Sequence, residues 1–571
     1  MNKKVKIGGT ITTLNDKMYI ASGGQADVFL NSNTIYKIYH NSNEILPLKK
    51  IQELSLIKNP SVTIPKDIVY DYSDGKPIGY VMNYVLGDPL LKLFTKTFKA
   101  DNNINPQMVS ELVKQIQLTT HDIHKSQILI VDLNELNIIV NIPNLLTYFI
   151  DTDSYQTPSF KSHFLMDSIR DRRVSKMVNG SIVYNPDELS DWFSWGVLTF
   201  QLYTNIHPFR GNHSAYKPRD KQRQMDDGIS VFHSGVKLPP TVNDFKTWIP
   251  KRHLDWFIDT FRDGHRSVPP LADSVMPLTV PAPIVNITGN KEIEITQTDS
   301  YSENIRSVIQ SMGLNYVITD KKIYCNGKEL FDGCNRFKKV LLCPSSDGTM
   351  VMATLLNDIV TFTELIRQQV VGSITSKGMI FRNKCIYTVN NGKLVENRFT
   401  TTGNRILHRI TEIENVSSLT TVMYDGCCLQ NLLGRYYLVL PYQEGVGFSK
   451  YLPQIDGYRI VDCRAERNVV VIIAEKGGKY DRFVIVFTKK DFTDFNVRKV
   501  EDVSYDEINF TTTESGLTLL LANPDELELF VNNSNIQVIQ NPPFDSSMKL
   551  FNNSDGVFFT NGKSVHRVKR K

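Results

Sequence analysis

The chain has 571 residues, of which 41% are hydrophobic and 22% are charged, and its formal net charge is +5. This composition is typical of a globular protein and excludes a largely disordered chain. The net charge is small for this length, so the composition does not require a nucleic-acid partner, and none is expected.

No uninterrupted apolar run approaches the roughly 20 residues that span a bilayer. The basic start of the sequence, MNKKVKIGG, is not followed by the apolar core of a secretory signal. We therefore expect no membrane partner and a cytoplasmic location. The 7 cysteines include no CxxC pair, and we expect reduced residues in a protein core rather than disulfides or zinc ligands.

Residues 1–275 mix strand-like and helix-like segments, and strands are predicted at residues 17–22, 27–40 and 78–85. The turn between the first two strands contains Gly23 and Gly24. Because glycine has no Cβ, the backbone N–H groups of such a turn can approach the phosphates of a nucleotide. The turn alone is weak evidence, since any hairpin can contain two glycines.

Lys37 interrupts the alternating pattern of the strand predicted at residues 27–40. On the inward face of that strand its ammonium would neutralise the α- and β-phosphates of a nucleotide, whereas on the outer face it would be an ordinary solvated lysine. The next segment, residues 44–59, has a helical pattern. It offers Glu53 to hold the Lys37 ammonium in place, with Glu44 as the competing choice.

A helix is predicted at residues 106–126, and the apolar run after it, expected to be a strand, ends at Asp132. Asn137 lies just before another apolar strand, and Asp151 ends the apolar run that follows. Phosphoryl transfer requires one carboxylate to orient the attacking hydroxyl and oxygen ligands to hold Mg²⁺ against the phosphates. These three residues would supply that set. The alternative is three unrelated polar residues at strand ends.

On these residues the sequence resembles the protein-kinase superfamily, and within it the divergent bacterial and phage kinase-like proteins. The stretch from Asp132 to Asn137 matches the catalytic loop of that family, and Asp151 matches the metal-binding aspartate. The resemblance implies that Asn137 and Asp151 hold Mg²⁺. It implies the catalytic residues Asp132, Lys37 and Asn134, the last standing where the family has a lysine. It also implies an ATP site formed by Gly23, Gly24, Gln25, Val28, Lys37, Glu53, Met82 and Tyr84, with the hinge between two lobes at residues 80–87.

Further motifs follow in the order of the family, up to about residue 272. Asp191 begins a helical pattern at residues 191–204 and resembles the aspartate that braces the catalytic loop. Arg266 resembles the late arginine that pairs with a glutamate of the activation segment, here expected to be Glu188.

Two departures from the family bear on activity. Ile130 and Val131 replace the His-Arg pair before the catalytic aspartate, so no dependence on activation-loop phosphorylation is expected. Thr152 and Asp153 replace the Phe-Gly pair after Asp151, which adds a carboxylate beside the metal site. Because the lysine, the base and both metal ligands are retained, catalysis is chemically possible, with a pseudokinase as the alternative.

The second half of the chain has a different pattern. Residues 276–285 are rich in proline and predict a linker. Residues 286–571 consist of short β runs separated by turns rich in Asn, Gly and Asp. They would divide into about seven units of roughly 40 residues, the size of a propeller blade. We expect an all-β domain, a β-propeller of about seven blades, with a pair of β-sandwiches as the alternative. The basic tail, residues 566–571, is expected to be frayed.

The fold class expected is therefore α+β, a two-lobed kinase-like domain followed by an all-β domain. The resemblance implies an ATP- and Mg²⁺-dependent Ser/Thr protein kinase whose β domain recruits a protein target. One alternative is a scaffold without catalysis, such as a pseudokinase or a phage structural or virion-associated protein. Another is a small-molecule kinase. The abundance of Asn and Lys suggests an AT-rich genome, as in phages and many bacteria; a phage protein would lie in the host cytoplasm or the virion.

Overall fold

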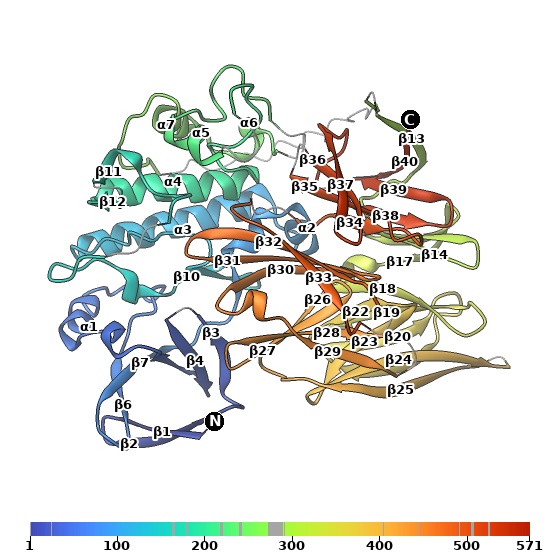
Figure 1. Ribbon diagram of the computed structural model, residues 1–571, viewed down its shortest axis with the longest axis horizontal. Helices are drawn as coiled ribbons and strands as arrows, with labels where there is room; N and C mark the ends of the chain where they lie inside the picture. The colour runs from blue at the N-terminus through green and yellow to red at the C-terminus, as the bar shows by residue number, and fades with distance from the viewer. Residues whose placement is uncertain are drawn as a thin grey trace. The chain divides into compact units, whose positions relative to one another are not determined.

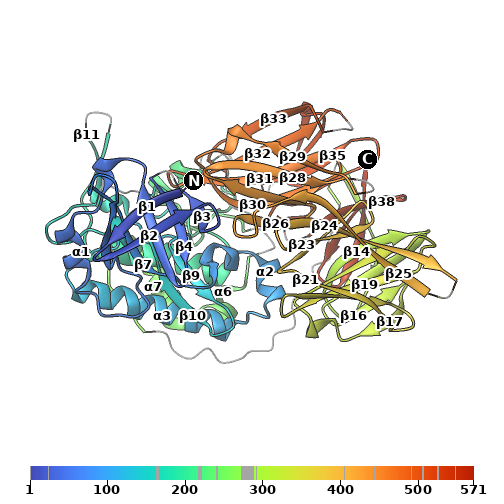
Figure 2. The same cartoon turned by 90° about the horizontal axis from the view of Figure 1, so that it is seen from below.

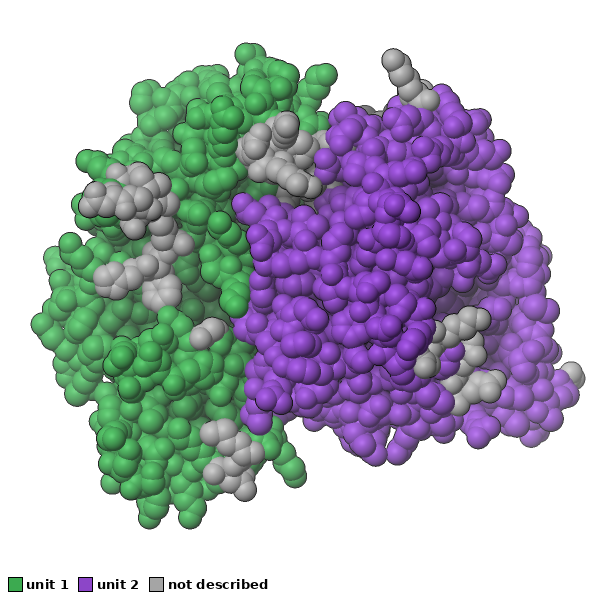
Figure 3. Space-filling model, in the orientation of Figure 1, with its two compact units in different colours: residues 1–284, 476–479 green, residues 285–475, 480–571 purple. Residues whose placement is uncertain are grey.

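The computed structural model describes residues 2–23, 25–162, 166–178, 181–216, 221–238, 242–271, 289–290, 292–403, 405–442, 445–489, 492–503, 507–523, 526–546 and 548–571. The chain forms two compact units (Figures 1 and 3): unit 1 is residues 1–284 with 476–479, and unit 2 is residues 285–475 with 480–571. The predicted linker, residues 276–285, lies outside the described residues. In the described part of the chain, no helix is both long and apolar enough to cross a membrane.

Unit 1 begins with a seven-stranded sheet of order β2-β1-β6-β7-β5-β4-β3, in which neighbouring strands are antiparallel. Its strands are β1 (Asn2–Ile7), β2 (Thr10–Asn15), β3 (Tyr19–Ser22), β4 (Ala26–Asn31), β5 (Thr34–Tyr39), β6 (Asp67–Asp71) and β7 (Pro77–Asn83). The strands predicted at residues 17–22, 27–40 and 78–85 are confirmed, the second as a hairpin.

One face of this sheet is apolar, and this decides where Lys37 points. Tyr36 and Ile38 belong to the buried cluster on that face. Side chains alternate along a strand, so Lys37, between them on β5, faces the opposite side. β7 lies close against β5 at this position, because a Cβ on Gly79 would collide with the carbonyl oxygen of Lys37. Glycine permits the approach.

The rest of unit 1 is mainly helical, and Figure 1 shows the two longest helices side by side. The helices are α1 (Leu48–Leu54), α2 (Lys96–Asp101), α3 (Pro106–Lys125), α4 (Glu188–Thr204), α5 (Lys221–Asp226), α6 (Phe245–Trp248) and α7 (Lys251–Phe261). Short strands accompany them: β8 (Asp88–Pro89), β9 (Ile138–Asn141), β10 (Leu146–Phe149), β11 (Ser175–Val178) and β12 (Ser181–Tyr184).

The helix α4 forms the centre of this helical part. Asp187 caps its start, accepting a hydrogen bond from Ser190 N at 2.8 Å, and Asn205 ends it in the left-handed conformation with φ 63°. Between these caps nearly every side chain is buried. Trp195 packs against the ring of Trp256 on α7 with ring centroids 5.6 Å apart. The aromatic core holds the start of α4, and with it Asp191, in place.

Unit 2 consists, among its described residues, of seven four-stranded antiparallel sheets (Figures 1 and 2). Six sheets each take four consecutive strands. The first three are β14 (Ile305–Ser311), β15 (Leu314–Thr319), β16 (Lys322–Cys325) and β17 (Lys328–Asp332); β18 (Lys339–Pro344), β19 (Met350–Leu356), β20 (Ile359–Glu364) and β21 (Val370–Thr375); and β22 (Met379–Arg382), β23 (Cys385–Asn390), β24 (Lys393–Thr402) and β25 (Arg405–Asn415). The next three are β26 (Thr421–Tyr424), β27 (Cys427–Leu432), β28 (Arg435–Pro441) and β29 (Gly447–Tyr451); β30 (Arg459–Glu466), β31 (Val469–Lys476), β32 (Lys479–Phe487) and β33 (Phe495–Val500); and β34 (Phe510–Thr512), β35 (Thr518–Asn523), β36 (Glu526–Val531) and β37 (Ser534–Gln540).

The seventh sheet joins the two ends of unit 2. Its order is β13-β40-β39-β38, so β13 (Ile293–Ser300) pairs with β40 (Ser564–Arg570), beside β39 (Gly556–Asn561) and β38 (Leu550–Asn553). The expectation of a frayed tail is wrong, because the backbone of β40 is hydrogen-bonded to strands on both sides. Repeated four-stranded sheets with this closure make unit 2 a propeller-like β domain.

The cysteines are free, as expected. Six of them are buried and Cys325 is partly buried. The Sγ atoms of Cys427 and Cys463 lie 3.4 Å apart, a contact distance rather than a bond. They act as small core residues of unit 2.

Candidate phosphate-handling site

The hairpin of β9 and β10 brings two of the predicted metal ligands to the same end of a sheet. Its register pairs Ile138 with Phe149. Asn137 directly precedes the first strand, Asp151 follows the second by two residues, and Ile150 N donates to the carbonyl oxygen of Asn137 at 2.9 Å. An antiparallel pair places the residue before one strand beside the residues after the other. The two polar residues therefore lie at one end of the hairpin.

Asp132 lies in a tight loop held by two asparagines. Its carboxylate accepts hydrogen bonds from Asn134 Nδ2 at 2.9 Å and from Asn137 Nδ2 at 3.1 Å. The oxygen of the Asn134 side chain accepts from the backbone N–H groups of residues 136 and 137 at 2.8 and 3.1 Å. Asn134, which is 5% exposed, is thus used within the loop and orients Asp132. Since Asn137 donates through nitrogen, its Oδ1 is the atom suited to a metal ion.

The apolar run before Asp132 is not the strand that the pattern predicts. Within it, Leu129 forms a single bridge with Gln156, and the chain otherwise follows an irregular buried path. Val131 has φ 65°, a left-handed conformation that is uncommon for a β-branched residue. Apolar periodicity does not distinguish a buried loop from a buried strand, which explains the error.

Asp191 holds this loop, as the sequence predicts. It is 1% exposed and accepts from Ile130 N at 2.7 Å and Val131 N at 2.8 Å. Its carboxylate also bonds His124 Nε2 at 2.9 Å. A buried carboxylate at the start of α4 therefore satisfies two backbone donors of the loop and keeps Val131 in its strained conformation.

Lys37 binds two carboxylates that follow β10. Its Nζ lies 2.5 Å from Asp151 Oδ1 and 2.9 Å from Asp153 Oδ2. The hydroxyl of Tyr39 donates to Asp153 Oδ2 at 2.7 Å, and Lys50 Nζ on α1 donates to the carbonyl oxygen of Asp153 at 2.6 Å. The side chain of Asp151 is 44% exposed, against 8% for Asp153, so Asp151 is the carboxylate open to a ligand.

The prediction that Glu53 or Glu44 pairs with Lys37 is wrong. Glu53 accepts a hydrogen bond from Ser159 N at 3.2 Å, and Glu44 lies in a short 3-10 helix, Ser42–Glu44, before α1. On α1 the contact with the site is made by Lys50, which has the opposite charge. A carboxylate supplied by residue 153 replaces the expected glutamate, because the backbone turn after β10 carries it directly to Lys37.

Burial and charge act in opposite directions on this cluster. Burial by itself would lower the pKa of Lys37, but the carboxylates of Asp151 and Asp153 outweigh it and raise that pKa above its ordinary value. Burial would raise the pKa of Asp153, but the Lys37 ammonium and the hydrogen bonds from Lys37 and Tyr39 lower it to about 2. Both groups are therefore charged at neutral pH.

The pKa of Asp153 predicts how unit 1 responds to acid. An aspartate lowered to about 2 in the folded protein stabilises the fold above its unfolded pKa of about 4 and loses that contribution as the pH falls towards 2. We expect Asp153→Asn to lower the unfolding free energy by about 2 kcal/mol at neutral pH. Between pH 4 and 2, the unfolding free energy of the variant should depend less steeply on pH than that of the wild type.

This prediction is measurable by urea unfolding at a series of pH values. The 4 tryptophans of the chain, at positions 192, 195, 248 and 256, all lie in unit 1, so their fluorescence reports on that unit. Asp122→Asn, at a carboxylate 44% exposed on α3, is the control. If the unfolding free energy of Asp153→Asn fell as steeply with pH as that of the wild type, the lowered pKa of Asp153 would be contradicted.

Apart from Glu53 on α1, the described residues of the predicted nucleotide site lie on or next to the seven-stranded sheet that carries Lys37. Gly23 N donates to Ala26 O at 2.9 Å across the turn between β3 and β4. Gln25 lies within this turn, and Gly24 lies outside the described residues. Val28 pairs directly with Lys37 in the register of β4 and β5. Met82 and Tyr84 lie at the end of β7, on the other side of β5: Met82 pairs with Ile35, and Tyr84 N donates to Asn33 O at 3.0 Å.

The late arginine pairs with a different acid from the one predicted. Arg266 binds both oxygens of Asp171 at 2.9 Å, not Glu188, which is in the first turn of α4. Asp171 is fully buried and precedes the short 3-10 helix Arg172–Val174. Arg266 therefore forms an ion pair with an acidic residue, as predicted, but the acid is Asp171, which precedes Glu188 in the chain.

The sequence reasoning gave no role to Tyr39 and Lys50. Tyr39 lies two positions beyond Lys37 on the same face of β5, and this spacing would have been a signal. No sequence pattern indicated Lys50, because α1 contains several charged residues and only the folded structure shows which of them contacts the site.

The residues present fit a Mg²⁺ ion. The amide oxygen of Asn137 and the partly exposed carboxylate of Asp151 are the hard oxygen donors that Mg²⁺ prefers, and Asp153 adds a further carboxylate behind them. Within the described ranges, no group of three or more His, Cys, Asp or Glu side chains that could hold a metal ion occurs.

No family model matches the sequence, and no curated protein matches it. Among solved structures, the protein kinase PK-1 of Cydia pomonella granulovirus matches with 14% sequence identity and a TM-score of 0.31, over 45% of this chain and 87% of that one. The chain thus combines an α+β unit with an all-β unit. The assignment of unit 1 to the protein kinases stays a prediction from the sequence.

Proposed function

We propose that unit 1 binds ATP with Mg²⁺ and transfers the γ-phosphoryl group to a Ser or Thr hydroxyl of a protein. We propose in addition that unit 2 is a seven-bladed propeller that recruits this target. The observation that carries the first proposal is the joint placement of Asp132 and Asn137, hydrogen-bonded at 3.1 Å, and of Lys37 and Asp151, paired at 2.5 Å.

The residues have distinct roles in this proposal. Lys37, anchored by Asp151 and Asp153, presents its ammonium to the nucleotide phosphates. Asp132, oriented by Asn134 and Asn137, accepts the proton of the attacking hydroxyl, because the hydrogen bonds from both asparagines fix its carboxylate in place. Asn137 Oδ1 and Asp151 would hold Mg²⁺, which neutralises charge on the phosphates when it is bound.

Nucleotide binding can be tested apart from catalysis. We expect ATP with Mg²⁺ to raise the melting temperature of unit 1, followed by tryptophan fluorescence, and Lys37→Met to weaken ATP binding about tenfold or more, since it removes the phosphate counter-charge. Lys125→Met, at an exposed lysine of α3, should bind ATP as the wild type does. ATP binding that is unaffected by Lys37→Met would contradict the assignment of Lys37.

The second candidate is a scaffold that binds nucleotide without transferring phosphate. It is favoured by one observation: Asp153 holds Lys37 through both of its oxygens, at 3.0 and 2.9 Å. Phosphates would compete with this carboxylate for the same ammonium. Stabilisation by ATP without transfer of label to the protein or to a protein substrate would support the scaffold.

A further inference from the structure

The ammonium of Lys37 is shared between two carboxylates. Its Nζ lies 2.5 Å from Asp151 Oδ1 and 3.0 and 2.9 Å from the two oxygens of Asp153. The rings of Tyr39 and Tyr80 lie beside it, each with its centroid 5.9 Å from Nζ, and the Lys37 side chain is only 10% exposed. Because little water reaches them, these ion pairs are weakly screened.

Asp153 is fixed by contacts that do not involve Lys37. The hydroxyl of Tyr39 donates to its Oδ2 at 2.7 Å, and Lys50 Nζ donates to its carbonyl oxygen at 2.6 Å. The residue lies in the short 3-10 helix Thr152–Ser154, and its side chain is 8% exposed. These contacts keep the carboxylate beside Lys37 when a ligand approaches.

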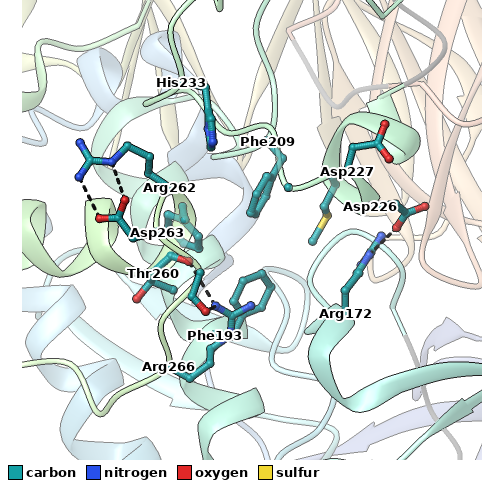
Figure 4. Close-up of a pocket in the computed structure, with 14 residues that line it drawn as sticks. Arg172, Phe193, Phe209, Asp226, Asp227, His233, Thr260, Arg262, Asp263 and Arg266 are labelled. Atoms are coloured by element: carbon teal, nitrogen blue, oxygen red, sulfur yellow. Dashed lines mark hydrogen bonds and ion pairs between the residues drawn. The ribbon is translucent and has the colours of Figure 1, made fainter.

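The ion pairs around the cavity in Figure 4 are built differently. This cavity of about 300 Å³ lies in the helical part of unit 1, and neither Lys37 nor its partners line it. Arg262 pairs with Asp263 at 2.8 Å, and Arg172 pairs with Asp226 at 2.6 Å, one carboxylate to each arginine. A second carboxylate is therefore not a general feature of the ion pairs of unit 1.

The charges around Lys37 leave no surplus for a polyanion. Lys37 and Lys50 bring positive charge, Asp151 and Asp153 bring negative charge in equal number, and Asp132 adds a further carboxylate to the proposed site. A nucleoside triphosphate carries about four negative charges at neutral pH, and a bound divalent cation cancels about half of them. Without the cation, the phosphates would compete with Asp153 for Lys37 and gain no net counter-charge.

We propose that Asp153 is a specificity-determining residue, which makes this site select metal-bound nucleoside triphosphates over metal-free ones. The carboxylate keeps the Lys37 ammonium neutralised, so that a nucleotide binds tightly only when it brings a divalent cation. This inference rests on the nucleotide site proposed above for unit 1, and it assigns to Asp153 a role in binding beyond the anchoring of Lys37.

The test is calorimetric titration of the full chain with ATP, once with Mg²⁺ in excess and once with EDTA. The quantity compared is the selectivity, the Kd of metal-free ATP divided by the Kd of ATP with Mg²⁺. We expect Asp153→Asn to lower the selectivity about tenfold or more, mainly by tightening the binding of metal-free ATP. The variant removes one negative charge, and the more highly charged ligand gains more from that removal.

Two further variants separate charge from structure. Asp122→Asn, at a half-exposed carboxylate of α3, should leave the selectivity unchanged. Tyr39→Phe removes the hydrogen bond to Asp153 at 2.7 Å and keeps both carboxylates, so its selectivity should stay within about twofold of the wild type. Because Asp153→Asn is expected to be less stable than the wild type, all titrations are made well below its melting temperature.

The proposal is overturned if Asp153→Asn has the selectivity of the wild type, or if Tyr39→Phe lowers the selectivity as much as Asp153→Asn does. It is overturned equally if Asp153→Asn weakens only the binding of ATP with Mg²⁺, which would make Asp153 a metal ligand. In each of these cases the wild type still binds ATP with Mg²⁺, so the nucleotide site stands. A wild type that binds ATP under neither condition would remove the nucleotide site, and this inference with it.

Discussion

Asp132→Asn is expected to lower the rate of phosphoryl transfer about 10²- to 10⁴-fold while leaving ATP binding nearly unchanged. The loss follows from removing the group that accepts the proton of the attacking hydroxyl. Binding should persist because asparagine has the same shape and its oxygen can still accept one of the two hydrogen bonds that Asn134 and Asn137 now donate to Asp132, at 2.9 and 3.1 Å.

The measurement is transfer of label from ATP to a generic protein substrate, together with mass spectrometry of phosphosites after co-expression. Asp122→Asn, at a half-exposed carboxylate of α3 that pairs with Lys125 at 3.1 Å and accepts from Asn59 Nδ2 at 3.0 Å, is the matched control and should retain the wild-type rate. A wild type that binds ATP and transfers no label would favour the scaffold, and an Asp132→Asn variant as active as the wild type would remove Asp132 from the mechanism.

Asp191→Ala is expected to lower the unfolding free energy of unit 1 by about 3–5 kcal/mol. The variant leaves the N–H groups of residues 130 and 131 without their acceptor and leaves His124 without its partner, all in a buried region. It also removes the hydrogen bond to Val131 N that holds this residue in a left-handed conformation.

Urea unfolding followed by tryptophan fluorescence measures this loss. Trp192 neighbours the substituted residue and packs edge-on against the His124 ring at 5.3 Å, so the native fluorescence should change as well. Asp122→Ala is the control for removal of a carboxylate from the same helical part. A loss below about 1 kcal/mol, the level of a surface ion pair, would show that the loop does not depend on Asp191.

The sequence predicted residues whose roles depend on backbone position, and it failed on ion pairs formed between distant segments. Asn137 and Asp151 were named from their order and spacing beside apolar runs, and the hairpin register places them at one end of a sheet; their role as metal ligands stays a prediction. Asp191 was named from the family resemblance, and its hydrogen bonds to residues 130 and 131 confirm the contact with the loop. The partner of Lys37 was assigned wrongly, since it depends on which acid the turn after β10 directs towards β5. Asp153 was noted only as a carboxylate near the metal site.

The same reason explains the partner of Arg266. Several acids lie within reach of that arginine along the chain, and the pattern gives no distances, so Asp171 could not be selected over Glu188. In unit 2, by contrast, alternating runs and polar turns were sufficient to predict the sheets, because each sheet is built almost entirely from neighbouring hairpins.

The pairing of β13 with β40 has a consequence during translation. At about 5–20 residues per second, the ribosome needs on the order of 10 to 50 s to proceed from β13 to β40. Throughout that interval the nascent chain carries β13 without its eventual neighbour, an open strand edge of the kind that invites pairing with other chains. A stalled or shortened product that ends between residue 479 and β40 would therefore contain a complete unit 1 attached to an aggregation-prone β domain.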